Sequence, residues 1–215
     1  MIDFVKVRQS DHRFTLRTEG LRATGHLEIS VNVDANLIEE AERFLKYVSD
    51  YLSISGKQLM PGETMAYGYW LVKFLVVEQG DHLETWEYSA DASDFEKGAD
   101  QTLGYWRDQH FVCDQHNAAF SPPRPDKLTV VSAGVLEGLP VQGIRYPSPD
   151  HMSGWWITTD LYDGNTKTLR HEHTYHLTAA RPDLAKYLAL PDGFRFNFSV
   201  AEEVWFDEKV LEPAT

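Results

Sequence analysis

The chain has 215 residues, of which 42% are hydrophobic and 25% charged, a composition typical of a folded globular protein rather than a disordered one. Its formal net charge is -13 and its pI is about 5.0. An acidic surface repels phosphate polymers, so nucleic acids and anionic membranes are not expected as partners, whereas a basic protein would suit it.

The first half of the chain predicts an antiparallel sheet that carries one helix. Residues 3–16 alternate around a polar break and predict a hairpin. Residues 25–33 carry apolar side chains at every second position, which predicts a strand with one buried face. From Asp34 the apolar spacing becomes helical, and this helix is expected to end before Gly56.

Beyond that helix, residues 65–77 are rich in aromatic and β-branched side chains and predict one long strand. A turn around Gln79 leads into a second strand at residues 83–88. Residues 94–113 are expected to form a second helix, weakened by its glycines.

Residues 121–125 hold three prolines and predict an extended connector. We therefore divide the chain into an N-terminal domain, residues 1–121, with an acidic segment, and a C-terminal domain, residues 122–215. The expected fold class is α+β: two small sheet-containing domains, mainly antiparallel strands with a few packed helices.

In the C-terminal domain the expected elements are strands at 127–134, 141–146, 153–159 and 171–177, a short helix at 181–191 and a strand from 193. Residues 202–211 are expected to pack Val204, Trp205, Phe206 and Leu211 onto this domain. Trp155 and Trp156 are consecutive, so on a strand one should lie in the core and the other on an open face or against the first domain.

Five short motifs follow one another in this region: Ser153-Gly154-Trp155, His176-Leu177-Thr178, Pro182-Asp183, Tyr187-Leu188 and Pro191-Asp192-Gly193-Phe194-Arg195-Phe196. Their order resembles that in the C-terminal domain of bacterial immunity protein family thirty-three, one of the families of immunity proteins that protect against polymorphic toxins. The resemblance implies a protein that binds and neutralises a cognate toxin, an interbacterial effector, by stoichiometric occlusion. It implies neither catalysis nor a cofactor.

The region from Glu78 to Asp114 holds ten acidic residues and two basic ones. Such a surface would steer the protein onto a basic toxin, although acidic runs are also common on solvated faces. Aromatic side chains nearby would supply buried contact. The predicted partner-binding residues are Glu84, Trp86, Glu87, Asp91, Asp94, Asp100, Tyr105, Trp106 and Trp156.

The alternative function is a metal-dependent hydrolase. Residues 171–176 contain three histidines, and on a strand His171 and His173 would project from one face, with Glu172 between them. The helical metalloprotease pattern is absent, because Tyr175 stands four residues after His171. The simpler interpretation is a polar, partly exposed strand, so no metal is assigned. A third possibility is a regulatory or scaffold domain that binds a small ligand between the two halves.

The single cysteine, Cys113, has no cysteine partner for a disulfide or a structural zinc site. We interpret it as a structural, half-buried residue rather than a nucleophile, although His110 and His116 lie nearby in sequence. The first residues lack the basic segment and the continuous apolar segment of a secretory signal, which predicts a cytoplasmic protein. The oligomeric state stays open.

Overall fold

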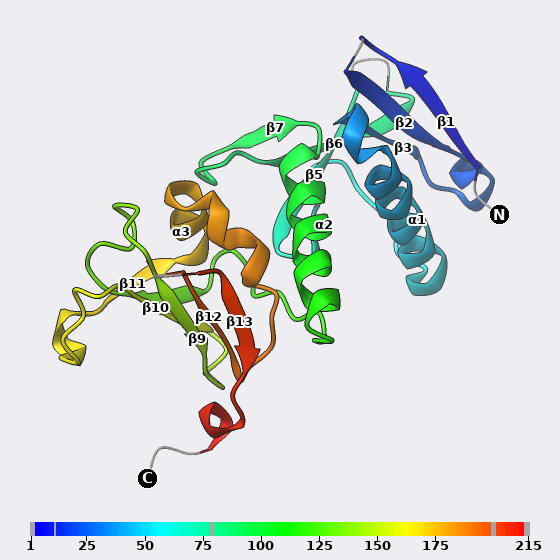
Figure 1. The fold of residues 1–215 in the computed structure, drawn as a ribbon. Coiled ribbons are helices and arrows are strands. Elements are labelled where there is room, and N and C mark those ends of the chain that lie inside the picture. Colours follow the sequence, from blue (N-terminus) through cyan, green and yellow to red (C-terminus); the bar gives the residue numbers. More distant parts are fainter. Residues whose placement is uncertain (1–2, 11, 78–79, 199–200, 213–215) are drawn as a thin grey trace. The chain divides into compact units, whose positions relative to one another are not determined.

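The structure is a computed structural model that describes residues 3–10, 12–77, 80–198 and 201–212. The chain divides into two compact units, Met1–Arg107 and Asp108–Thr215, whose boundary falls within helix α2 (Asp100–Gln115). Each unit contains a β-sheet and helices (Figure 1), which confirms the predicted α+β class. The division at residue 121 stays a prediction about where independently folding domains separate.

The first unit is built on a seven-stranded sheet with the path β1-β2-β3-β6-β5-β4, and β7 pairs with β6 off this path. Its strands are β1 (Asp3–Arg8), β2 (Arg13–Glu19), β3 (Glu28–Asp34), β4 (Thr64–Tyr67), β5 (Trp70–Val76), β6 (His82–Tyr88) and β7 (Phe95–Lys97). The pairs are antiparallel except β3 with β6. The predicted hairpin and the strand within residues 25–33 are confirmed; Asp11, Glu78 and Gln79 lie outside the described residues.

Helix α1 (Ile38–Ser55) packs its apolar stripe on one face of this sheet and confirms the first predicted helix. A short 3-10 turn, η2 (Ala35–Leu37), precedes it, and the Asp34 carboxylate accepts the N–H of Asn36 at 3.1 Å. Phe44 of α1 stacks on Phe74 of β5, and both side chains are fully buried. This packing makes the first core.

Two expectations for this unit are wrong. The single strand predicted at residues 65–77 is a hairpin of β4 and β5, because Gly68, at φ 60°, lets the chain reverse after Tyr67. The helix predicted from residue 94 begins only at Asp100. Gly98 has φ 116°, and a Cβ there would lie 2.8 Å from the Asn32 carbonyl oxygen, so β7 comes first and the helix follows.

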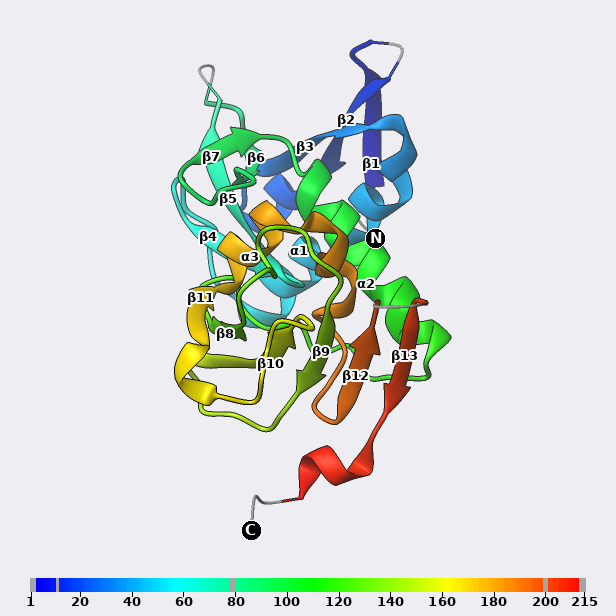
Figure 2. The same ribbon diagram turned by 60° about the vertical axis from the view of Figure 1, so that its left-hand side comes forward.

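The second unit holds a six-stranded sheet with the order β11-β8-β10-β9-β12-β13 (Figure 2). Its strands are β8 (Leu128–Val131), β9 (Gln142–Arg145), β10 (Met152–Thr158), β11 (Arg170–His173), β12 (Phe194–Asn197) and β13 (Glu203–Phe206). Its helices are α3 (Thr174–Ala180) and the 3-10 helices η3 (Thr166–Thr168), η4 (Pro182–Tyr187) and η5 (Glu208–Leu211). A further 3-10 helix, η1 (Leu21–Thr24), belongs to the first unit. Among the described pairs of this second sheet, only β8 and β10 run parallel.

The strand predicted at residues 171–177 is also wrong beyond His173. Thr174 donates its N–H to the Lys127 carbonyl at 2.9 Å, and the chain then turns into α3. Thr174, Leu177 and Thr178 are buried, a helical spacing that carries Leu177 into the core. No helix in the described part of the chain is long and apolar enough to cross a membrane.

Candidate partner-binding surfaces

The apolar residues of the motifs that carry the family resemblance lie in the interior of the second unit, whereas Pro182 and Asp183 are exposed. Trp155 is fully buried and donates its indole N–H to the Leu188 carbonyl at 3.1 Å. The Ser153 and Thr129 hydroxyls lie 2.8 Å apart, and the Ser153 oxygen accepts the Trp155 N–H. Gly154 has φ 83°, and a Cβ there would lie 2.5 Å from the Tyr146 carbonyl oxygen. These residues hold the fold rather than face a partner.

Arg145 is a structural residue that the sequence analysis missed. Its guanidinium is buried and donates through Nη1 to three backbone carbonyls, those of Ser121, Leu188 and Leu190. Its Nε lies 3.3 Å from the Asp192 carboxylate. Burial lowers the pKa of Arg145, and the Asp192 charge opposes that effect. An arginine at an inward position of a short apolar strand is the sequence signal for such a role.

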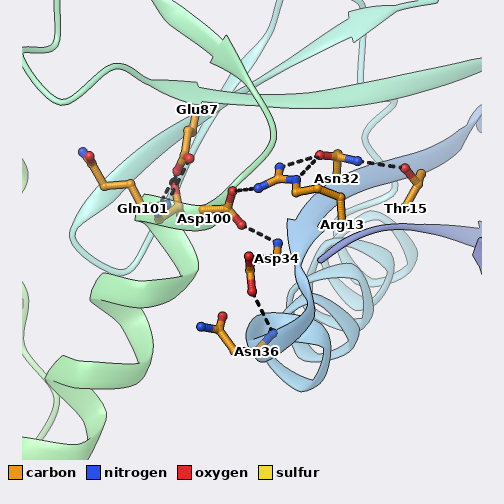
Figure 3. A network of polar contacts seen from close by, with 9 residues as sticks. Arg13, Thr15, Asn32, Asp34, Asn36, Glu87, Asp100 and Gln101 are labelled. Atoms are coloured by element: carbon orange, nitrogen blue, oxygen red, sulfur yellow. Dashed lines mark hydrogen bonds and ion pairs between the residues drawn. The ribbon is translucent and has the colours of Figure 1, made fainter. Parts of the chain in front are cut away.

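Two of the predicted partner-binding carboxylates organise the first turn of α2 (Figure 3). Glu87 is 8% exposed and accepts the N–H of Gln101 at 3.0 Å and of Thr102 at 2.6 Å, together with the Thr102 hydroxyl. Burial raises the pKa of Glu87, while these hydrogen bonds act in the opposite direction. Asp100 pairs with Arg13 and accepts the backbone N–H of Asp34 at 2.7 Å.

Three other predicted carboxylates are more open to solvent. Glu84 is half-buried on β6 and pairs with Lys97 at 2.6 Å. Asp91 and Asp94 are exposed in the turn that joins β6 to β7. The hydroxyls of Ser89 and Ser93 each donate to Asp91 at 2.7 Å, and these bonds lower its pKa to about 2. Asp91 therefore presents negative charge to solvent at neutral pH.

The predicted aromatic residues fall into separate settings. Trp106 packs against the first core and stacks on Tyr67 at 5.7 Å between ring centroids. Tyr105 packs edge-on to Trp70 at 5.5 Å. Trp86 is half-buried on β6, and its indole N–H finds no acceptor among the described residues.

Trp156 belongs to the second unit, so the predicted set does not form a single patch within either unit. Its ring is half-buried and meets Tyr146 edge-on, at 5.8 Å between centroids. Trp155 beside it is fully buried. The prediction that one of the two tryptophans lies in the core is therefore confirmed for Trp155.

The histidines of the alternative function lie on two elements. His171 is exposed on β11, and the Nδ1 atom of His173 lies 2.8 Å from the Asp126 carbonyl oxygen. His176 is on α3, with its ring 5.9 Å from that of His173. Among the residues that the structure describes, no three His, Cys, Asp or Glu side chains are grouped so that they could hold a metal ion.

Cys113 lies in α2, where it is 1% exposed. Burial raises the pKa of its thiol to about 11, with a smaller contribution from Asp114. A thiol in this setting is protonated at neutral pH. It matches the structural interpretation more closely than the nucleophilic one, although the residue is fully rather than half buried.

The C-terminal segment carries exposed apolar side chains that the sequence analysis expected to be packed. Trp205 is 38% exposed, Phe206 52% and Leu211 42%, whereas Val210 is buried. Phe206 nevertheless packs on Phe194, with 5.4 Å between ring centroids, so the expectation was wrong in part only. The side chains stay partly open because β13 is the last strand of its sheet and has a neighbour on one side only. A usable signal was present in sequence: residues 202–212 hold five acidic residues and one basic residue around the aromatic pair.

Comparison of the sequence with known proteins identifies a family for part of the chain. Residues 108–207 match the family model described as the Imm33-like domain. No curated protein and no solved structure matches the chain. The matched stretch begins at the first residue of the second unit and contains all the resembling motifs. Residues 108–207 therefore carry an Imm33-like domain, which confirms the resemblance to immunity protein family 33 for this part of the chain.

Proposed function

We propose that this chain is an immunity protein that binds a cognate toxin in the cytoplasm and neutralises it by stoichiometric occlusion. The observation that carries the proposal is the Imm33-like domain at residues 108–207. Occlusion needs a surface that covers the toxin's working face and needs no catalytic group. The buried motif residues, such as Trp155 and Leu188, hold the core of the second unit, so we expect exposed side chains around that core to recognise the toxin.

The net charge of -13 supports a basic toxin as partner. Among the predicted partner-binding residues, Asp91 and Asp94 are the exposed acids, and Glu84 and Trp86 are half-buried on the adjoining strand. Glu87 and Asp100 contribute through the order they impose on α2. Exposed acids accelerate association with a basic partner, and that acceleration weakens as salt rises.

Co-expression tests the proposal. The chain is expressed with the product of its neighbouring gene in a host which that product kills, and the pair is then co-purified. Immunity by occlusion requires rescue together with a stable one-to-one complex. A neighbour that harms no host, or rescue without a complex, would contradict occlusion.

Steering is tested by the double variant Asp91→Lys with Asp94→Lys. Its association rate at low salt should fall by about 10-fold, and the difference from wild type should shrink at high salt. The matched control is Glu42→Lys with Glu137→Lys, which changes the net charge equally at exposed positions outside the acidic segment. An equal loss in both variants would show that only the total charge matters.

A further inference from the structure

The edge strand β13 has backbone N–H and C=O groups on its open side that are not paired with another described strand. It is the terminal strand of the second sheet and pairs with β12 alone (Figures 1 and 2). The N–H of Asp207 donates to the Gly193 carbonyl at 2.8 Å, toward β12. Backbone groups alternate in direction along an antiparallel strand, so those of Val204 and Phe206 point to the open side. In the described part of the chain, nothing pairs with that side.

Two aromatic side chains of this edge, Trp205 and Phe206, are exposed, and Phe206 is held in place by its neighbours. The Phe206 ring lies 5.4 Å from Phe194, and it covers Gly193 so closely that a Cβ there would lie 2.5 Å from it. Trp205 projects from the opposite face, across from Arg195. Natural proteins usually protect edge strands with lysine, proline or a covering element, and exposed apolar patches mark interaction sites. An ordered aromatic edge is therefore a candidate docking surface.

The acidic residues around β13 favour a basic partner. Asp207 is paired with Arg195 at 3.2 Å. The exposed charged residues on or beside the strand are four acids and one lysine: Glu202, Glu203, Glu208, Glu212 and Lys209. A second copy of this chain would bring the same acids to the same edge and be repelled, whereas a basic segment would be attracted.

We propose that β13 is a docking edge for an extended, basic segment of the toxin, which adds to the second sheet as a further strand. The segment would pair with the outward backbone groups of Val204 and Phe206 and contact the aromatic rings on either face. This inference rests on the proposed function, because the toxin is its occupant. It assigns recognition to the Imm33-like domain, separately from the acidic residues of the first unit.

Proline provides a sharp test. The Val204→Pro substitution removes an N–H that points away from β12, so the free protein keeps its backbone hydrogen bonds between β12 and β13. A strand added at the open edge would lose one backbone hydrogen bond and would clash with the proline ring. The matched control is His171→Pro on β11, the opposite edge. There Thr174 bonds inward to Lys127, so by alternation the His171 N–H also points outward. Circular dichroism and thermal unfolding confirm that both variants fold.

With the co-purified toxin as probe, Val204→Pro should weaken binding by about 30-fold or more, and His171→Pro by less than about 3-fold. In hydrogen exchange, the amides of Val204 and Phe206 should become protected in the wild-type complex. A wild-type chain that neither binds nor neutralises the toxin would overturn the proposed function and this inference with it. Equal binding by wild type and Val204→Pro, without amide protection, would overturn the docking edge alone. A free dimer that Val204→Pro dissociates would also overturn it, and would assign the edge to self-association.

Discussion

Trp155 of β10 donates its indole N–H to the backbone carbonyl of Leu188, 3.1 Å away, and both side chains are fully buried. The bond joins two motifs that lie far apart in sequence, Ser153-Gly154-Trp155 and Tyr187-Leu188. Arg145 donates to the same carbonyl at 3.1 Å. Parts of three motifs by which the resemblance is recognised, Trp155, Leu188 and Phe196, thus lie in one packed core.

Replacing Trp155 with Phe should lower the free energy of unfolding by about 2 kcal/mol, because it leaves a small cavity and removes the bond to Leu188. Urea unfolding measures the change. Trp156→Phe is the matched control: this ring is half-buried, so its loss should cost less than about 1 kcal/mol. Equal costs at the two positions would contradict the structural role of Trp155.

Glu87→Ala should destabilise the first unit by about 2–3 kcal/mol, since the first-turn amides of Gln101 and Thr102 would lose their buried acceptor. Glu84→Ala removes a carboxylate from the same strand. Its partner Lys97 is exposed, so the expected cost is below about 1 kcal/mol. Chemical unfolding of both variants checks the contrast. If Glu87→Ala unfolds like wild type, the carboxylate does not anchor α2.

The elements best predicted from the sequence are those whose partners lie nearby in the chain. The stripe of α1 and the alternation around Ile29 are local patterns, and both were confirmed. The hairpin at Gly68 was missed because the strand-like composition continues through the turn. The exposure of Trp205 depends on strand order, because the same residues would be buried in a central strand; the acidic residues around it were the one local signal of exposure.

The same limit applies to the candidate site. Counting charges locates an acidic segment but does not separate exposed acids such as Asp91 from buried ones such as Glu87. That separation depends on where α2 begins, since the first-turn amides draw Glu87 inward. The motifs of the family resemblance include core residues such as Trp155 and Leu188, whereas no motif in the sequence separates the exposed acids from the buried ones.

Asp91 should titrate with a pKa of about 2, below the ordinary value of 3.8, because Ser89 and Ser93 donate hydrogen bonds to its ionised form. A lowered folded-state pKa means that its contribution to stability is present above pH 3.8 and is lost as the pH falls toward about 2. Carboxyl NMR titration measures this pKa. The variant Ser89→Ala with Ser93→Ala should move it toward 3.8; an unchanged pKa would show that the hydroxyls are not its cause.

Gly154→Ala should destabilise the second unit by about 3 kcal/mol or more, because two costs act together there. The residue has φ 83°, a conformation that alanine adopts with strain, and the added Cβ would lie 2.5 Å from the Tyr146 carbonyl oxygen. Gly164→Ala isolates the first cost: this glycine has φ 87° and no atom within 4 Å of the place a methyl group would take, so about 1 kcal/mol is expected. Thermal and urea unfolding of both variants provide the measurement. If Gly154→Ala is no less stable than Gly164→Ala, the backbone beside Tyr146 shifts to make room for the methyl group. Glycine in the Ser-Gly-Trp motif would then be required only for its positive φ.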